Sequence, residues 1–152
     1  MLPFLALLLT FSSTLKDTPG AIVTCSTLTR FQVETALGHR LNQDTEEYSR
    51  FACTRNYSAD DVAVTISIQH LTSALDLNAE LGSLKAAFPG AKLSEVKGLA
   101  ERAFALDIPG AGTQLHVLPD EREYLLISVL GVGGDDHGFN AAIRIARSLM
   151  SR

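Results

Sequence analysis

The sequence predicts an α+β domain in which a mainly antiparallel sheet of about five to six strands is flanked by three helices. Two observations carry this prediction. Segments with an apolar residue at every second position are separated by short turns rich in Pro, Gly and Asp, which is typical of antiparallel strands. Segments with apolar residues at helical spacing stand before, between and after them. The expected order is helix, two strands, helix, three strands, helix, with one disulfide.

The first helix is predicted over residues 30–37. Thr29 and Gln32 form a capping box, because the threonine hydroxyl can accept the Gln32 amide while the glutamine side chain reaches back to the Thr29 N–H. Gly38 follows the helix at the position where a left-handed residue is favoured.

A β-hairpin is predicted next. Residues 40–47 are polar and indicate a loop, residues 48–57 alternate, and residues 58–61 are turn-forming. The strand that follows has strict period-two apolar residues: Val62, Val64, Ile66 and Ile68. This pattern is the clearest strand in the chain.

The second helix is predicted to begin at Thr72 or Ser73, either of which can cap it, and to end at Pro89–Gly90. Its apolar stripe consists of Leu77, Leu81, Leu84 and Phe88. The helical spacing of these residues predicts that they face the sheet.

The remaining chain predicts three strands and a last helix. Residues 91–101 are irregular, with a possible short edge strand at Leu93 and Val96. The strands are expected at 102–108, 113–118 and 123–130, and the helix at about 137–150. Its inward residues are expected to be Phe139, Ala142, Ile143, Ala146 and Leu149, with Arg144, Arg147 and Arg152 on the outer face.

Length and charge bound the class of protein. The 152 residues fit a single domain, expected at 25–152, and the net charge of −4 makes nucleic acid an unexpected partner. Residues 1–14 contain an apolar run too short to cross a bilayer, which favours a secretory signal and a secreted or periplasmic address. No Lys or Arg precedes the run, so a buried first strand or helix, or an uncleaved anchor, stays as an alternative.

Cys25 and Cys53 are the only cysteines. In an oxidising compartment they most simply pair with each other, closing a loop of about 29 residues, which would contribute roughly 3–4 kcal/mol. The alternative is a redox-active or nucleophilic cysteine, which usually needs a C-x-x-C motif or a positioned base. The sequence shows neither.

The chain resembles a group of small secreted bacterial domains of unknown function over residues 25–150. The shared features are the Cys25–Thr29 start, Leu37–Gly38 after the first helix, and the late strand pair Leu115–Val117 and Leu126–Gly131. This resemblance implies a PsbP-like, Mog-type α/β/α sandwich, a fold used for docking to other proteins and for accessory roles. It supplies no catalytic residues.

The glycine-rich segment 131–138 connects the last strand to the last helix. Such a turn can hold phosphate on its amides, but the adjacent Asp135 and Asp136 would repel an anion. The favoured interpretation is that Asp135 or Asp136 caps the helix. A cation site formed by Asp135, Asp136 and His137 is a weak alternative, because neighbouring residues seldom converge on one ion.

The other histidines are His39, His70 and His116, and no pair has the spacing of a metal site. The sequence has no nucleophile elbow, and nothing in it calls for a cofactor. We therefore expect an extracytoplasmic, non-enzymatic module that binds a protein partner or a small apolar ligand beside its sheet. The alternative is a hydrolytic or metal-dependent enzyme that uses scattered residues such as His70, His116 and the 135–137 turn.

Overall fold

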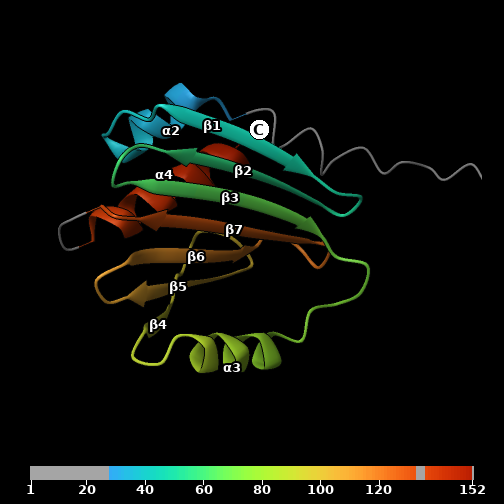
Figure 1. The fold of residues 1–152 in the computed structure, drawn as a ribbon. Helices are drawn as coiled ribbons and strands as arrows, with labels where there is room; N and C mark the ends of the chain where they lie inside the picture. The colour runs from blue at the N-terminus through green and yellow to red at the C-terminus, as the bar shows by residue number, and fades with distance from the viewer. Residues whose placement is uncertain (1–27, 133–135, 152) are drawn as a thin grey trace, which may run out of the picture.

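The computed structural model of the chain describes residues 28–132 and 136–151. Their elements, in chain order, are α2 (Arg30–Leu37), β1 (Gln43–Tyr48), β2 (Ala52–Ser58), β3 (Ala63–His70), α3 (Leu77–Ala87), β4 (Lys92–Glu95), β5 (Arg102–Ile108), β6 (Gly112–Leu118), β7 (Glu123–Leu130) and α4 (His137–Met150). The strands form one antiparallel sheet in the order β1-β2-β3-β7-β6-β5-β4 (Figure 1). The β3–β7 pairing at its centre therefore joins an early meander to a late one.

This architecture corrects the predicted fold class. The sheet has seven strands rather than five to six, because β1 and β4 extend it at its two edges. No disulfide is found within residues 28–132 and 136–151, which hold only Cys53 of the two cysteines. The predicted pairing with Cys25 and the predicted signal segment 1–14 fall outside the described residues.

The start of α2 confirms the predicted capping box. The amide of Gln32 donates to Thr29 Oγ1 at 3.3 Å, and the amide of Thr29 donates to Gln32 Oε1 at 2.8 Å. Gly38 ends the helix at φ 70°, in the left-handed region that glycine enters without strain. Val33 and Leu37, both fully buried, face the core from this helix.

α4 follows its predicted bounds and packs on α2, β6 and β7. Its buried side is rotated slightly from the prediction, since Ala141 and Ile145 are buried while Phe139 is only half-buried. Arg144 was predicted on the outer face, but its Nε and Nη2 donate to the carbonyl of Ala36 at 2.9 and 2.6 Å. This contact satisfies a carbonyl that the end of α2 would otherwise leave free.

The main core lies between the sheet and the pair α2 and α4. Alternate residues of the central strands point into it: Val64, Ile66, Ile68, Leu125, Ile127, Val129, Leu115 and Val117. The predicted period-two strand is confirmed by this burial. Because the sheet is antiparallel with a register fixed on every strand, the same parity decides which residues of the edge strands share this face.

The opposite face of the sheet divides into two parts. Buried Phe104, Leu106, His116 and Tyr124 lie on the half near β4–β7, where α3 packs and Glu80 contacts Tyr124. Figure 1 shows α3 beside β4 and β5, and no helix in front of β1–β3. That second half is polar, with hydrogen-bonded pairs such as Thr65 Oγ1 to Asn56 Oδ1 at 2.9 Å.

Two element predictions were wrong. Residues 40–47 were expected to be a loop, but Gln43–Tyr48 forms β1, in which all six residues are exposed. α3 begins at Leu77 rather than near Thr72 or Ser73, because Asp76 caps it by accepting the Ala79 amide at 3.1 Å. None of its residues is buried, so the predicted apolar stripe is only half-covered.

The later strands confirm the predicted ranges within a residue. β4 corresponds to the short edge strand expected at Leu93. Among the helices of residues 28–132 and 136–151, none is long and apolar enough to cross a membrane.

Candidate functional site

A pocket of about 700 Å³ lies on the helix side of the sheet, over β4–β6 and beside the start of α4. α4 contacts β6 and β7 but leaves the edge strands β4 and β5 uncovered there, which is why the hollow forms. Its apolar lining includes Ala105, Ile108, Val132 and Phe139. Its size falls within the range of about 300–1,000 Å³ that is usual for small-molecule sites.

Three polar side chains of the pocket stand in one row across three strands. Lys92 of β4 is in register with Asp107 of β5, which is in register with Thr113 of β6. All three share the helix-side parity and line the pocket. Neighbouring strands are about 4.8 Å apart, so the sheet itself sets the spacing of an ammonium, a carboxylate and a hydroxyl.

The wall around this row needs glycine at specific positions. A Cβ on Gly112 would stand 2.2 Å from the Val129 carbonyl oxygen, and one on Gly131 would stand 1.7 Å from the Asp61 carbonyl oxygen. Both glycines also have positive φ values of 151° and 79°. These close backbone approaches hold the turns that border the pocket.

Asp136 forms the opposite side of the pocket at the N-terminus of α4. It occupies the N-cap position with φ 63°, but its side chain makes no capping hydrogen bond. The prediction that it caps the helix is therefore corrected: the position is right and the hydrogen bond is absent. Asp135, the other candidate cap, lies outside the described residues.

The three weak metal candidates do not form a site in the described structure. His137 Nε2 donates to the carbonyl of Leu37 at 2.9 Å, which fastens α4 to the end of α2. Asp136 faces the pocket instead, and Asp135 is not described. Among residues 28–132 and 136–151, no group of three or more His, Cys, Asp or Glu side chains could hold a metal ion.

His70 and His116 lie far from the pocket in the sheet register. His70 ends β3 opposite Glu123, at the end of β7 that is distant from α4. His116 is on the other face of the sheet, as its parity against Leu115 and Val117 predicted. His39 is exposed, with Nδ1 donating to the Arg40 carbonyl at 2.8 Å.

His116 belongs to a buried polar contact beneath α3. Its Nδ1 is hydrogen-bonded to the hydroxyl of Tyr124, which also lies 3.5 Å from Glu80 Oε1. Its Nε2 is buried without a hydrogen-bond partner, and burial lowers the pKa of His116 to about 4. Burial and the nearby Glu80 carboxylate raise the pKa of Tyr124. The histidine is therefore neutral near pH 7.

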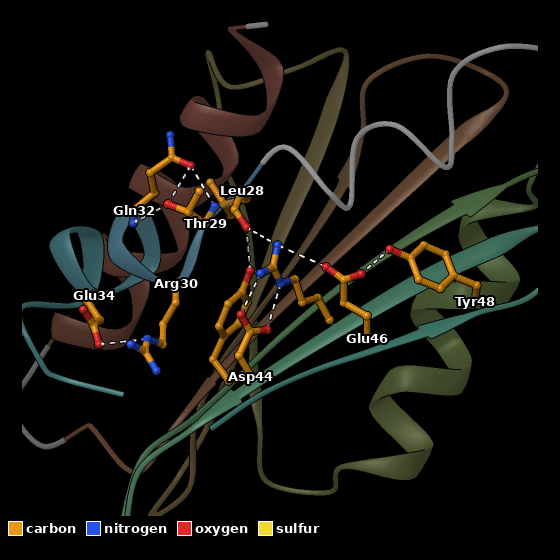
Figure 2. Close-up of polar contacts among 10 residues, drawn as sticks. Leu28, Thr29, Arg30, Gln32, Glu34, Asp44, Glu46 and Tyr48 are labelled. Carbon is orange, nitrogen blue, oxygen red and sulfur yellow. Dashed lines mark hydrogen bonds and ion pairs between the residues drawn. The ribbon is translucent and has the colours of Figure 1, made fainter. Parts of the chain in front are cut away.

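A second polar cluster joins β1 and β2 to the start of the described chain (Figure 2). Arg55 donates to Asp44 at 2.9 and 2.6 Å, approaches Glu46 at 3.3 Å, and donates to the Leu28 carbonyl. The same carbonyl accepts the hydroxyl of Tyr57 at 2.9 Å. Because the guanidinium is bound by these acceptors, the pKa of Arg55 is raised and the cluster serves to fasten the edge of the sheet.

Sequence reasoning found only one wall of the pocket. The 131–138 segment was singled out for its glycines, and Gly131, Val132, Asp136 and Gly138 do line the hollow. Lys92, Asp107 and Thr113 were missed, because only the strand register brings them together. The one local sign was Asp107, a charge near the end of an otherwise apolar strand.

Comparison of the chain with protein-family models, with curated proteins and with solved structures found no match. The resemblance to the PsbP-like domains stays a prediction.

Proposed function

We propose that the chain is an extracytoplasmic, non-enzymatic binding module that holds a small, partly apolar ligand in the pocket over β4–β6. The observation that carries this proposal is the pocket itself: a hollow of about 700 Å³ with both apolar and charged walls. Pockets that combine an apolar lining with a few fixed polar groups are the usual form of small-ligand sites.

The setting of the pocket supports a binding role. Its floor is the sheet, whose inward residues beside it, Ala105 and Thr113, are more than nine-tenths buried. Its rim is made of turns that glycine contacts hold against neighbouring backbone, as at Gly112. A site built on a rigid floor loses little conformational entropy when a ligand binds.

The enzymatic alternative would draw on residues that the described structure separates. His116 is on the α3 side of the sheet, while the pocket and His137 are on the other side. His70 is at the opposite end of β3 and β7 from α4. The arrangement favours the binding module, because acid–base catalysis needs its groups within hydrogen-bonding reach of one substrate.

A blocking substitution tests the pocket. Ala111 is exposed at the rim, so Ala111→Trp should fill the entrance without disturbing the core. We expect the wild type to bind one equivalent of the dye 1-anilinonaphthalene-8-sulfonate in a fluorescence titration, and the variant to bind it at least tenfold more weakly. Ala87→Trp, at the exposed end of α3, is the matched control and should bind like the wild type. Equal binding by all three proteins, or no binding by the wild type, would contradict the proposal.

The proposed address rests on the apolar run within residues 1–14. When the chain is produced with its own N-terminus in a bacterial host, we expect it in the periplasmic fraction. Leu8→Arg, which places a charge within the run, should retain it in the cytosol. If wild type and variant both stay in the cytosol, the address is wrong and the pocket is unaffected.

A further inference from the structure

The charges of the pocket point to a specific class of ligand. We propose, resting on the binding function above, that the pocket takes a small zwitterion carrying one carboxylate and one ammonium group beside an apolar side chain, as a free apolar amino acid does. The carboxylate would bind Lys92 and Thr113, and the ammonium would bind Asp107 and Asp136.

The first support is that Lys92 and Asp107 are opposed but not paired. They are cross-strand partners on one face, yet among the described residues no ion pair within 4.0 Å joins them. Both side chains are exposed at the pocket. A ligand with two opposite charges can satisfy both groups at once, whereas an ion of one sign would be repelled by one of them.

The second support is Thr113. Its side chain lines the pocket while the residue is only 7% exposed, and none of the hydrogen bonds among the described residues uses its hydroxyl. A buried hydroxyl is ordinarily hydrogen-bonded, so one that opens onto a cavity is available to a ligand. It stands next to Asp107 in the register.

The third support is the remaining wall. Asp136 places a second carboxylate across the pocket from Lys92's strand, and its side chain is not used to cap α4. One cation and two carboxylates fit an ammonium that is shared by two acceptors. Ile108, Val132 and Phe139 provide the apolar surface for the ligand's side chain.

Four related probes test the assignment by isothermal titration calorimetry. L-Phenylalanine carries both charges, phenethylamine only the ammonium, 3-phenylpropionate only the carboxylate, and 3-phenylpropanol neither. We expect L-phenylalanine to bind at one site and each singly charged probe to bind about tenfold or more weakly, the effect of losing one charge-assisted contact. Equally tight binding of either singly charged probe would overturn the zwitterion assignment.

Charge-removing variants give the cross-check. Lys92→Met should weaken L-phenylalanine and 3-phenylpropionate but not phenethylamine. Asp107→Asn should weaken L-phenylalanine and phenethylamine but not 3-phenylpropionate. Both positions are exposed, so both variants should fold, and Lys85→Met and Asp60→Asn are the matched exposed controls. Identical effects on all probes would overturn the proposed roles.

The outcomes separate this inference from the binding function. If the uncharged 3-phenylpropanol binds as tightly as L-phenylalanine, and Ala111→Trp abolishes both, the pocket is a binding site but not one for zwitterions. If no probe binds and the dye also fails, both proposals are wrong.

Discussion

His116 shows how a single buried residue links this fold to pH. Burial lowers its pKa from 6.5 to about 4, so between these values the unfolded chain binds a proton that the folded chain does not. Stability from this group is therefore complete above about pH 6.5 and is lost as the pH falls towards 4. The largest loss is about 3 kcal/mol, from 1.36 kcal/mol per pKa unit.

Replacing His116 tests this sign. We expect the free energy of unfolding of the wild type, measured by urea denaturation, to fall between pH 7 and 4.5, and that of His116→Gln to fall less over the same interval. His39→Gln, at an exposed position, should keep the wild-type slope. If His116→Gln and the wild type have parallel pH profiles, the histidine is not protonated on unfolding as described.

The capping box makes a second residue-scale prediction. Thr29→Ala removes the hydroxyl that accepts the Gln32 amide, and should lower the free energy of unfolding by about 1 kcal/mol. Thr35→Ala is the matched control, because the exposed Thr35 hydroxyl only donates to the Phe31 carbonyl within the helix. Thermal or urea unfolding measures both. An equal effect of the two changes would mean that the cap does not stabilise the start of α2.

Local rules predicted what single residues could decide. The capping box and the glycine after α2 depend on side chains within a few positions of each other, and both were predicted. The role of Arg144 was not, because its acceptor at Ala36 is more than a hundred positions away in the chain. Spacing along one helix identifies an outer face but not the carbonyl that this face meets.

At the scale of elements, α3 and α4 should differ in stability. α4 buries six residues in the main core, whereas α3 buries none. A helix with few buried contacts opens locally at a lower free energy than one fixed in the core. We therefore expect amides of α3 to exchange with deuterium at least tenfold faster than those of α4 in native-state exchange followed by NMR. Equal protection would contradict the packing described for α3.

The elements that sequence patterns missed are those without one-sided burial. β1 lies at the edge with all six residues exposed, so it lacks the alternation that revealed β3. Its place is set by pairing with β2 and by the hydrogen bonds from Arg55 to Asp44. α3 was extended too far towards its N-terminus because Thr72, Ser73 and Asp76 are all good caps, and only the structure selects Asp76.

At the scale of the whole molecule, the candidate site is a product of topology. Lys92, Asp107 and Thr113 are aligned by the β4–β5–β6 register, and Asp136 is added by the chain's return into α4. Sequence periodicity predicted the strands but not their neighbours across the sheet. The pocket therefore could not be predicted, although its glycine-rich wall could be noticed.

The most direct test of the account is an NMR titration of ¹⁵N-labelled protein with L-phenylalanine. The account predicts saturable amide shifts concentrated around Lys92–Ser94, Asp107–Thr113 and Gly138–Phe139, the segments that surround the pocket. Shifts concentrated on the polar face of β1–β3 or beneath α3, or no saturable shifts at all, would contradict it.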